Sequence, residues 1–121
     1  MARPAELNGR PRQRRLANVR AQVAAGAPCH LCGIPIDLTL DRQRDPLALA
    51  VDELIPRSAV PPHQRRALAL DPALTAPSHR VCNGSRGTKP ITTTVRERCR
   101  HLVEVELARR TVRRAVLVTT R

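Results

Sequence analysis

Two short cysteine and histidine motifs constrain this chain more than any other feature. Cys29 and Cys32 are separated by two residues, and His79 and Cys82 repeat that spacing after residues 33–78. A tetrahedral zinc ion takes four nitrogen or sulfur ligands, and two such turns supply them as two pairs. The sequence therefore predicts a structural zinc site with these four residues as ligands.

The alternative interpretation is a redox-active dithiol, or thiols that are simply buried. A redox C-x-x-C motif of the thioredoxin type begins a helix within a βαβ pattern, and no such pattern surrounds Cys29. The composition also favours a metal, since the 121 residues include no Phe, Trp or Tyr and only one Met. One small domain with an aliphatic core often needs a metal or a partner for its stability.

The net charge of +12 is concentrated at the two ends of the chain. Residues 1–28 carry +5 and residues 89–121 carry +6, whereas residues 29–88 carry only +1. Basic flanks around a near-neutral centre indicate a polyanionic partner, most simply nucleic acid, although arginine could also serve solubility alone. Because the chain has no aromatic rings on which bases could stack, we expect contacts to the backbone of duplex DNA.

Basic side chains on the N-terminal helix and near the metal motifs are the candidates for nucleic-acid binding. They are Arg12, Arg14, Arg15, Arg57, Arg80, Arg86 and Lys89. No apolar run reaches the length of a membrane span, and the N-terminus lacks an apolar signal core, so no membrane association is expected. A thiolate site together with an unpaired cysteine, Cys99, suits a reducing compartment and predicts a cytoplasmic location.

Periodicity and helix signals divide the chain into three segments. Residues 1–28 are expected to form a basic arm and a helix, which Pro11 can open and Gly26 can end. Residues 29–90 are expected to form a zinc-pinned core, and residues 91–121 a basic C-terminal helix and tail. The expected fold class is α+β.

Within these segments the pattern places short strands near residues 47–55 and 75–78. A helix is expected over residues 80–86, and a final helix over about residues 95–110. The apolar tail at residues 112–118 fits either a helical extension or a strand.

Asp52 and Glu53 form a carboxylate pair inside the first apolar strand. Buried carboxylates are costly unless opposite charge offsets them, so either the strand end is solvated or the pair serves a function. Their place between the two halves of the metal motif favours a function. His30, between the first two cysteines, is expected to point away from the zinc site, and Cys99 is expected to be a small core residue.

Three motifs together resemble the HNH endonuclease family, especially the small zinc-containing members common in phages and actinobacteria. They are C-x-x-C-G-x-P-I-D from Cys29, D-E-x-I-P from Asp52 and H-R-x-C-N-x-x-R-G from His79, and they span about residues 28–90. The resemblance implies a ββα-metal core that a structural zinc holds together. It also implies hydrolysis of DNA phosphodiesters and, for phage-type relatives, a link to the genome-packaging machinery.

The resemblance also implies roles for individual residues. Asp52 and Asn83 would bind a catalytic Mg²⁺ or Mn²⁺, which prefers hard oxygen ligands. Glu53 stands where the family usually has the histidine base, and it would orient or deprotonate the attacking water. Leu74 stands where the family has an asparagine that orders the loop, and Ala59-Val60-Pro61-Pro62 replaces its glycine pair.

The sequence thus predicts a metal-dependent DNA endonuclease of HNH type, and two alternatives stay open. One is a zinc-stabilised nucleic-acid-binding module that has lost catalysis through Glu53 and Leu74. The other is a zinc protein of an RNA–protein assembly. The carboxylate pair distinguishes the nuclease from the two alternatives. A protein that only binds a polyanion gains nothing from two carboxylates that face phosphate, whereas a cation site requires them.

Overall fold

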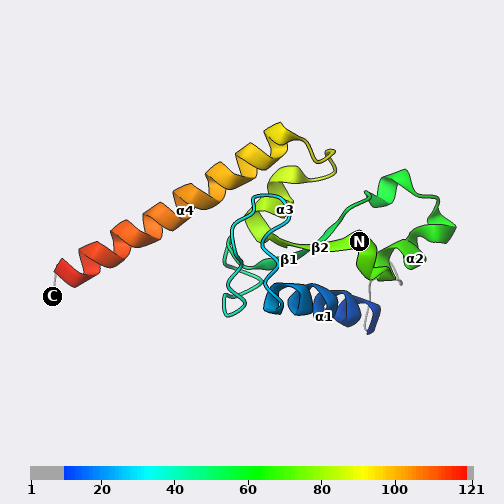
Figure 1. The fold of residues 1–121 in the computed structure, drawn as a ribbon, viewed down its shortest axis with the longest axis horizontal. Coiled ribbons are helices and arrows are strands. Elements are labelled where there is room, and N and C mark those ends of the chain that lie inside the picture. Colours follow the sequence, from blue (N-terminus) through cyan, green and yellow to red (C-terminus); the bar gives the residue numbers. More distant parts are fainter. Residues whose placement is uncertain (1–9, 120–121) are drawn as a thin grey trace.

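The computed structural model describes residues 10–119, except for the side chains of residues 11, 57, 70, 72 and 119, and it has an α+β fold (Figure 1). The predicted arm at residues 1–9 lies outside this range. In chain order the main elements are α1 (Arg10–Ala24), β1 (Leu49–Glu53), α2 (Arg65–Leu70), β2 (Thr75–His79), α3 (Arg80–Arg86) and α4 (Thr93–Thr119). Three short 3₁₀ turns lie between the strands: η2 (Arg57–Ala59), η3 (Pro62–Gln64) and η4 (Pro72–Leu74). The predicted fold class is confirmed.

The sheet is a single antiparallel pair, in which Leu49 lies opposite His79 and Asp52 lies opposite Ala76. The second strand and the helix that follows it lie where the sequence predicts them. The first strand begins two residues later than expected, at Leu49, and continues through both carboxylates. It can do so because each carboxylate meets an arginine, as described below.

The connection between the strands is ordered without the asparagine that Leu74 replaces. Asp71 caps η4, since its side chain accepts a hydrogen bond from the Ala73 amide at 2.9 Å. The Leu54 amide then donates to the Leu74 carbonyl at 2.9 Å, which closes this end of the hairpin. An aspartate three residues before Leu74 thus caps the turn that leads into β2.

One apolar core joins all three predicted segments. Its buried members come from α1, the C-x-x-C turn, β1, α3 and α4, and include Val19, Leu31, Leu49, Cys82, Cys99 and Val103. Figure 1 shows the hairpin between α1 and α3, and both helices contact it. The flanking helices are therefore parts of one folded unit, and Cys99 is the core residue that the sequence predicts.

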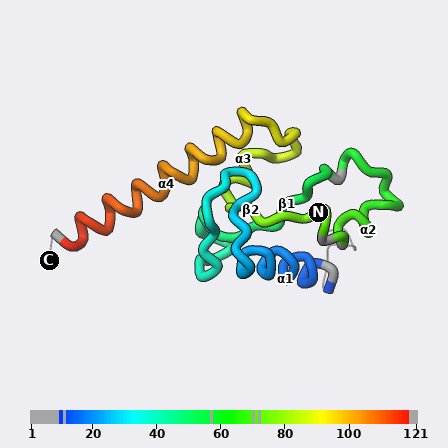
Figure 2. Tube along the Cα trace, in the orientation of Figure 1, coloured from blue at the N-terminus to red at the C-terminus, as the bar shows by residue number. Residues whose placement is uncertain are grey.

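The last helix is longer than predicted. α4 has 27 residues, and its distal half extends away from the rest of the chain (Figure 2). No glycine or proline interrupts residues 93–119, so the helix propagates from its docked first half into the apolar tail. Among the described residues, we find no helix with the length and apolar character needed to cross a bilayer.

Asp45 anchors α4 to the loop before β1. Its two oxygens accept hydrogen bonds from the Arg110 guanidinium at 2.6 and 3.2 Å. The hydrogen bonds from Arg110 hold the pKa of Asp45 below its ordinary value, and the Leu47 amide adds to the effect. A carboxylate with a depressed folded-state pKa adds stability above its unfolded pKa of about 3.9 and loses it as pH falls further.

We therefore expect Asp45→Asn to lower the free energy of unfolding by about 1 kcal/mol at pH 7, because a charge-assisted bidentate contact is lost. The difference from wild type should shrink as pH falls below about 4, and it should vanish only below the depressed folded-state pKa of Asp45, where both chains carry a neutral side chain. Urea unfolding at several pH values measures this. The matched control is Glu104→Gln, which breaks an exposed pair with Arg100 and should change stability by less than about 0.5 kcal/mol. Equal effects of the two variants at every pH would contradict the prediction.

Candidate metal centre and acidic pocket

The four predicted zinc ligands form one buried cluster. The ligand atoms of Cys29, Cys32, His79 and Cys82 all lie within 4.8 Å of one another. His79 Nδ1 is 3.3 Å from Cys32 Sγ and 3.8 Å from Cys82 Sγ. A tetrahedral zinc with bonds of about 2.0–2.3 Å places its ligand atoms roughly 3.5–3.8 Å apart. The cluster could therefore hold a structural metal such as zinc.

The C-x-x-C turn orients its own sulfurs through the backbone. The Cys32 amide donates to Cys29 Sγ at 3.5 Å, and the Ile34 amide donates to Cys32 Sγ at 3.4 Å. Gly33 makes the turn possible, because its φ of 79° lies in the left-handed region that favours glycine. Amide donors of this kind stabilise thiolates that bind a metal.

His79 is oriented at both ring nitrogens. Its Nδ1 faces the sulfurs, and its Nε2 donates to the Pro35 carbonyl at 3.1 Å, a contact that directs Nδ1 toward a metal. Burial lowers the pKa of His79, but its hydrogen bonds with Cys29 and Cys32 outweigh this and raise the pKa to about 9. Hydrogen bonds from Cys32 and Cys82 lower the pKa of the Cys29 thiol. A bound metal would displace the protons that these ligand atoms carry.

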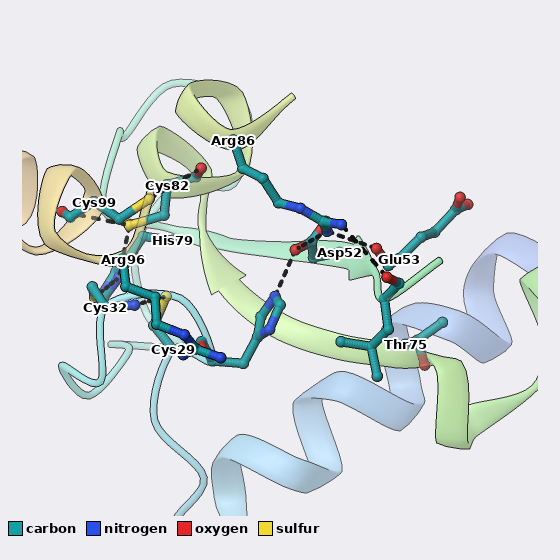
Figure 3. Close-up of polar contacts among 12 residues, drawn as sticks. Cys29, Cys32, Asp52, Glu53, Thr75, His79, Cys82, Arg86, Arg96 and Cys99 are labelled. Atoms are coloured by element: carbon teal, nitrogen blue, oxygen red, sulfur yellow. Dashed lines mark hydrogen bonds and ion pairs between the residues drawn. The ribbon is translucent and has the colours of Figure 1, made fainter. Parts of the chain in front are cut away.

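Asp52 is a buried carboxylate whose two oxygens are both hydrogen-bonded. Arg86 reaches it from α3, and Arg86 Nη1 lies 3.0 Å from Oδ1 and 2.9 Å from Oδ2 (Figure 3). His30 Nε2 donates to Oδ2 at 2.5 Å. Arg86 also bonds the Lys89 carbonyl through Nε at 2.9 Å, which holds the guanidinium in place. The end of β1, the C-x-x-C turn and α3 therefore meet at one carboxylate.

One sequence-based prediction is wrong here, and one contact was not predicted. Arg86 was expected to bind nucleic acid, but its side chain is 2% exposed and pairs with Asp52, because a buried carboxylate needs an opposite charge. His30 was expected to point away from the metal site, and it is not one of the four clustered ligands; its side chain instead bonds Asp52. The backbone explains this, since the His30 amide donates to the Pro77 carbonyl of β2 at 2.9 Å and ties the turn to the sheet. The histidine inside the C-x-x-C motif is the sequence feature that could have indicated this contact with Asp52.

Glu53 is paired as well. Arg15 of α1 donates from Nη2 to Glu53 Oε1 at 2.9 Å, and only 11% and 18% of the two side chains are exposed. Within residues 10–119, Arg15 Nε is buried without a hydrogen-bond partner. Each carboxylate of the predicted pair thus has its own guanidinium from a different helix.

The predicted catalytic residues line one cavity. Asp52 and Glu53 from β1 and Asn83 from α3 surround a space of about 270 Å³, together with Arg15 and Arg86. Asn83 follows the last metal-cluster residue along the chain, so folding of the cluster also brings its side chain to this cavity. The structure therefore brings together the three oxygen-bearing side chains that the sequence predicts to be catalytic.

The remaining predicted nucleic-acid contacts are spread over the surface. Arg12 and Arg14 on α1, Arg80 at the start of α3, and Lys89 are exposed. The side chain of Arg57 lies outside the described residues. Arg12 and Arg80 line a second cavity together with Arg42, which the sequence reasoning did not name.

No protein-family model, curated protein or solved structure matches this chain.

Proposed function

We propose that this protein is a metal-dependent DNA endonuclease of HNH type. A zinc ion would hold its hairpin and α3 together. The observation that carries the proposal is the convergence of Asp52, Glu53 and Asn83 on one cavity beside the Cys₃His cluster. A hairpin that leads directly into a helix bearing the last zinc ligand is also the arrangement that the family resemblance implies. By the same resemblance, we expect duplex DNA in the cytoplasm of a bacterial or phage-infected cell as the substrate, and the phage packaging machinery as a candidate partner.

Zinc fits the cluster as a structural ion. Three sulfurs and one imidazole fill the four positions of a tetrahedral site, so no position is left for water or substrate. Its role is to join the C-x-x-C turn to the start of α3, and thus to hold Asn83 opposite the end of β1.

The acidic cavity supplies the groups for hydrolysis. Asp52 and Asn83 would hold Mg²⁺ or Mn²⁺ through oxygen atoms, the ligands that these ions prefer. Such a cation, when bound, neutralises charge that develops on the phosphodiester. Glu53 accepts a proton from the attacking water. Arg86 and His30 fix the orientation of the Asp52 carboxylate.

One observation favours a second function, a nucleic-acid-binding module without catalysis. Asp52 is paired with Arg86, and Glu53 is paired with Arg15. In a binding module these carboxylates serve as counter-ions that hold two arginines in place, and no cation binds between them. The two functions differ in whether the cavity holds a divalent cation.

Plasmid nicking separates these functions. We expect the zinc-loaded protein to nick supercoiled DNA with Mn²⁺ and more slowly with Mg²⁺. Asp52→Asn should abolish nicking while leaving DNA binding intact, because it removes the negative charge of a cation ligand and preserves the shape of the side chain. The reaction is started by adding the cation rather than stopped by chelator, since a chelator would also remove zinc.

Substitutions at Glu53 test its role as the base. Glu53→Gln should slow nicking, and Glu53→His should accelerate it about 10-fold or more, because imidazole is the stronger base at neutral pH. Glu104→Gln, on the exposed face of α4, is the matched control and should leave the rate unchanged. If neither wild type nor Glu53→His cuts with either cation while both bind DNA, the binding module is the function.

A further inference from the structure

A basic cavity adjoins the acidic pocket. It has a volume of about 680 Å³ and is lined by Arg12 and Arg15 of α1, Arg42 of the loop before β1, and Arg80 of α3. Arg15, Val51 and Asn83 line both cavities. None of the residues that line the basic cavity is acidic. The two spaces therefore meet at these three residues, and only the acidic one has carboxylates in its lining.

Three of these arginines lack an acidic partner. Within residues 10–119, Arg12, Arg42 and Arg80 form no ion pair with a carboxylate, whereas Arg15, Arg86 and Arg110 all do. Arg42 Nε donates to the Leu49 carbonyl at 3.2 Å, which anchors the side chain beside β1. Burial, and then the charges of Arg20 and Arg12, lower the pKa of Arg42. The structure thus gathers like charges from three separate segments, and none of them has a carboxylate partner in the part of the chain that the structure describes.

A bound anion would offset the repulsion among these positive charges. Guanidinium groups bind phosphate through parallel N–H donors, and anchored arginines lose little freedom when they do so. We propose that Arg12, Arg42 and Arg80 form a binding site for a backbone phosphate of duplex DNA, next to the phosphate that is cleaved in the acidic pocket. The identification of the polyanion as DNA depends on the proposed function. Arg42 helps to position the DNA and takes no part in cleavage, because it lines the basic cavity and not the acidic one.

The salt dependence of DNA binding tests this site. The zinc-loaded full chain is titrated with a 20-base-pair duplex, without Mg²⁺ or Mn²⁺ so that no cleavage occurs. Each phosphate contact contributes about −0.9 to the slope of log K against log salt concentration. We expect the triple variant Arg12→Gln/Arg42→Gln/Arg80→Gln to make this slope shallower by about 2–3.

The matched control removes the same charge from α4 through Arg98→Gln/Arg109→Gln/Arg113→Gln, all exposed positions. It should change the slope by less than half as much. Equal changes in the two triple variants would overturn the site, because only overall charge would then matter. If the first triple variant does not fold, the exposed Arg80→Gln alone must change the slope by about 0.9, and no change overturns the proposal.

The failure of this site can be distinguished from failure of the nuclease. If the wild type nicks plasmid but the triple variant binds DNA with the wild-type salt slope, the phosphate site is disproved and the nuclease is not. A chain that never nicks, but whose triple variant shows the shallower slope, disproves the nuclease and keeps the site. Inorganic phosphate that competes with DNA at millimolar concentration supports it, whereas tighter binding of duplex RNA overturns the assignment to DNA.

Discussion

Cys82→Ser is expected to abolish cooperative unfolding and to leave the chain without bound zinc. Cys82 is fully buried and belongs to a cluster that joins the C-x-x-C turn to α3. Metal binding in such a site contributes directly to folding, by about 10–16 kcal/mol in zinc-finger peptides. The aliphatic core of this chain is too small to replace a contribution of that size. Thermal unfolding by circular dichroism, with elemental analysis of the purified protein, measures both effects.

Cys99→Ala is the matched control for this prediction. Cys99 is equally buried and lies near the cluster, where its thiol donates to the Cys82 carbonyl at 3.6 Å, but it is not one of the four clustered ligands. The control should keep one zinc per chain and a cooperative transition at a somewhat lower temperature. A wild-type protein that is folded and contains no metal would show that the cluster is an ordinary part of the core.

Arg86→Met is expected to lower the free energy of unfolding by about 3–5 kcal/mol, since it leaves Asp52 buried without its countercharge. Asp52 is 4% exposed, and methionine fills much of the volume of the arginine without supplying a donor. The backbone carbonyl of Glu53, which accepts from Arg86 Nη1 at 2.7 Å, also loses its partner. Urea unfolding of the zinc-loaded protein measures the loss.

The control for Arg86 is Arg109→Met, which removes an arginine that is 68% exposed and 3.8 Å from Glu106. It should change the free energy of unfolding by less than about 1 kcal/mol. In the double variant Arg86→Met/Asp52→Leu, much of the lost stability should return, because no charge is then left buried alone. Similar losses from Arg86→Met and Arg109→Met, or no recovery in the double variant, would mean that the buried pair is not what holds α3 to β1.

Several features of this protein follow from local patterns in the sequence. The spacing of the cysteine and histidine motifs identifies all four members of the buried cluster, because a C-x-x-C turn and an H-x-x-C helix start each bring two ligands together locally. Gly26, with a φ of 104°, follows α1 where the sequence predicts the end of that helix. The second strand and the helix over residues 80–86 follow from the same kind of local signal.

Other features depend on pairings between distant residues, which only the tertiary structure decided. Arg86 lies 34 positions from Asp52. The two meet because β2 returns the chain to Leu49 at the start of β1, and α3 then runs back toward the end of β1, where its last residue bonds Asp52. Arg42 joins Arg12 and Arg80 because α1, the loop before β1 and the start of α3 border the same cavity. Charge counting along the sequence treats every arginine as equally free, whereas burial and proximity determine which ones hold the fold together and which ones remain to bind an anion.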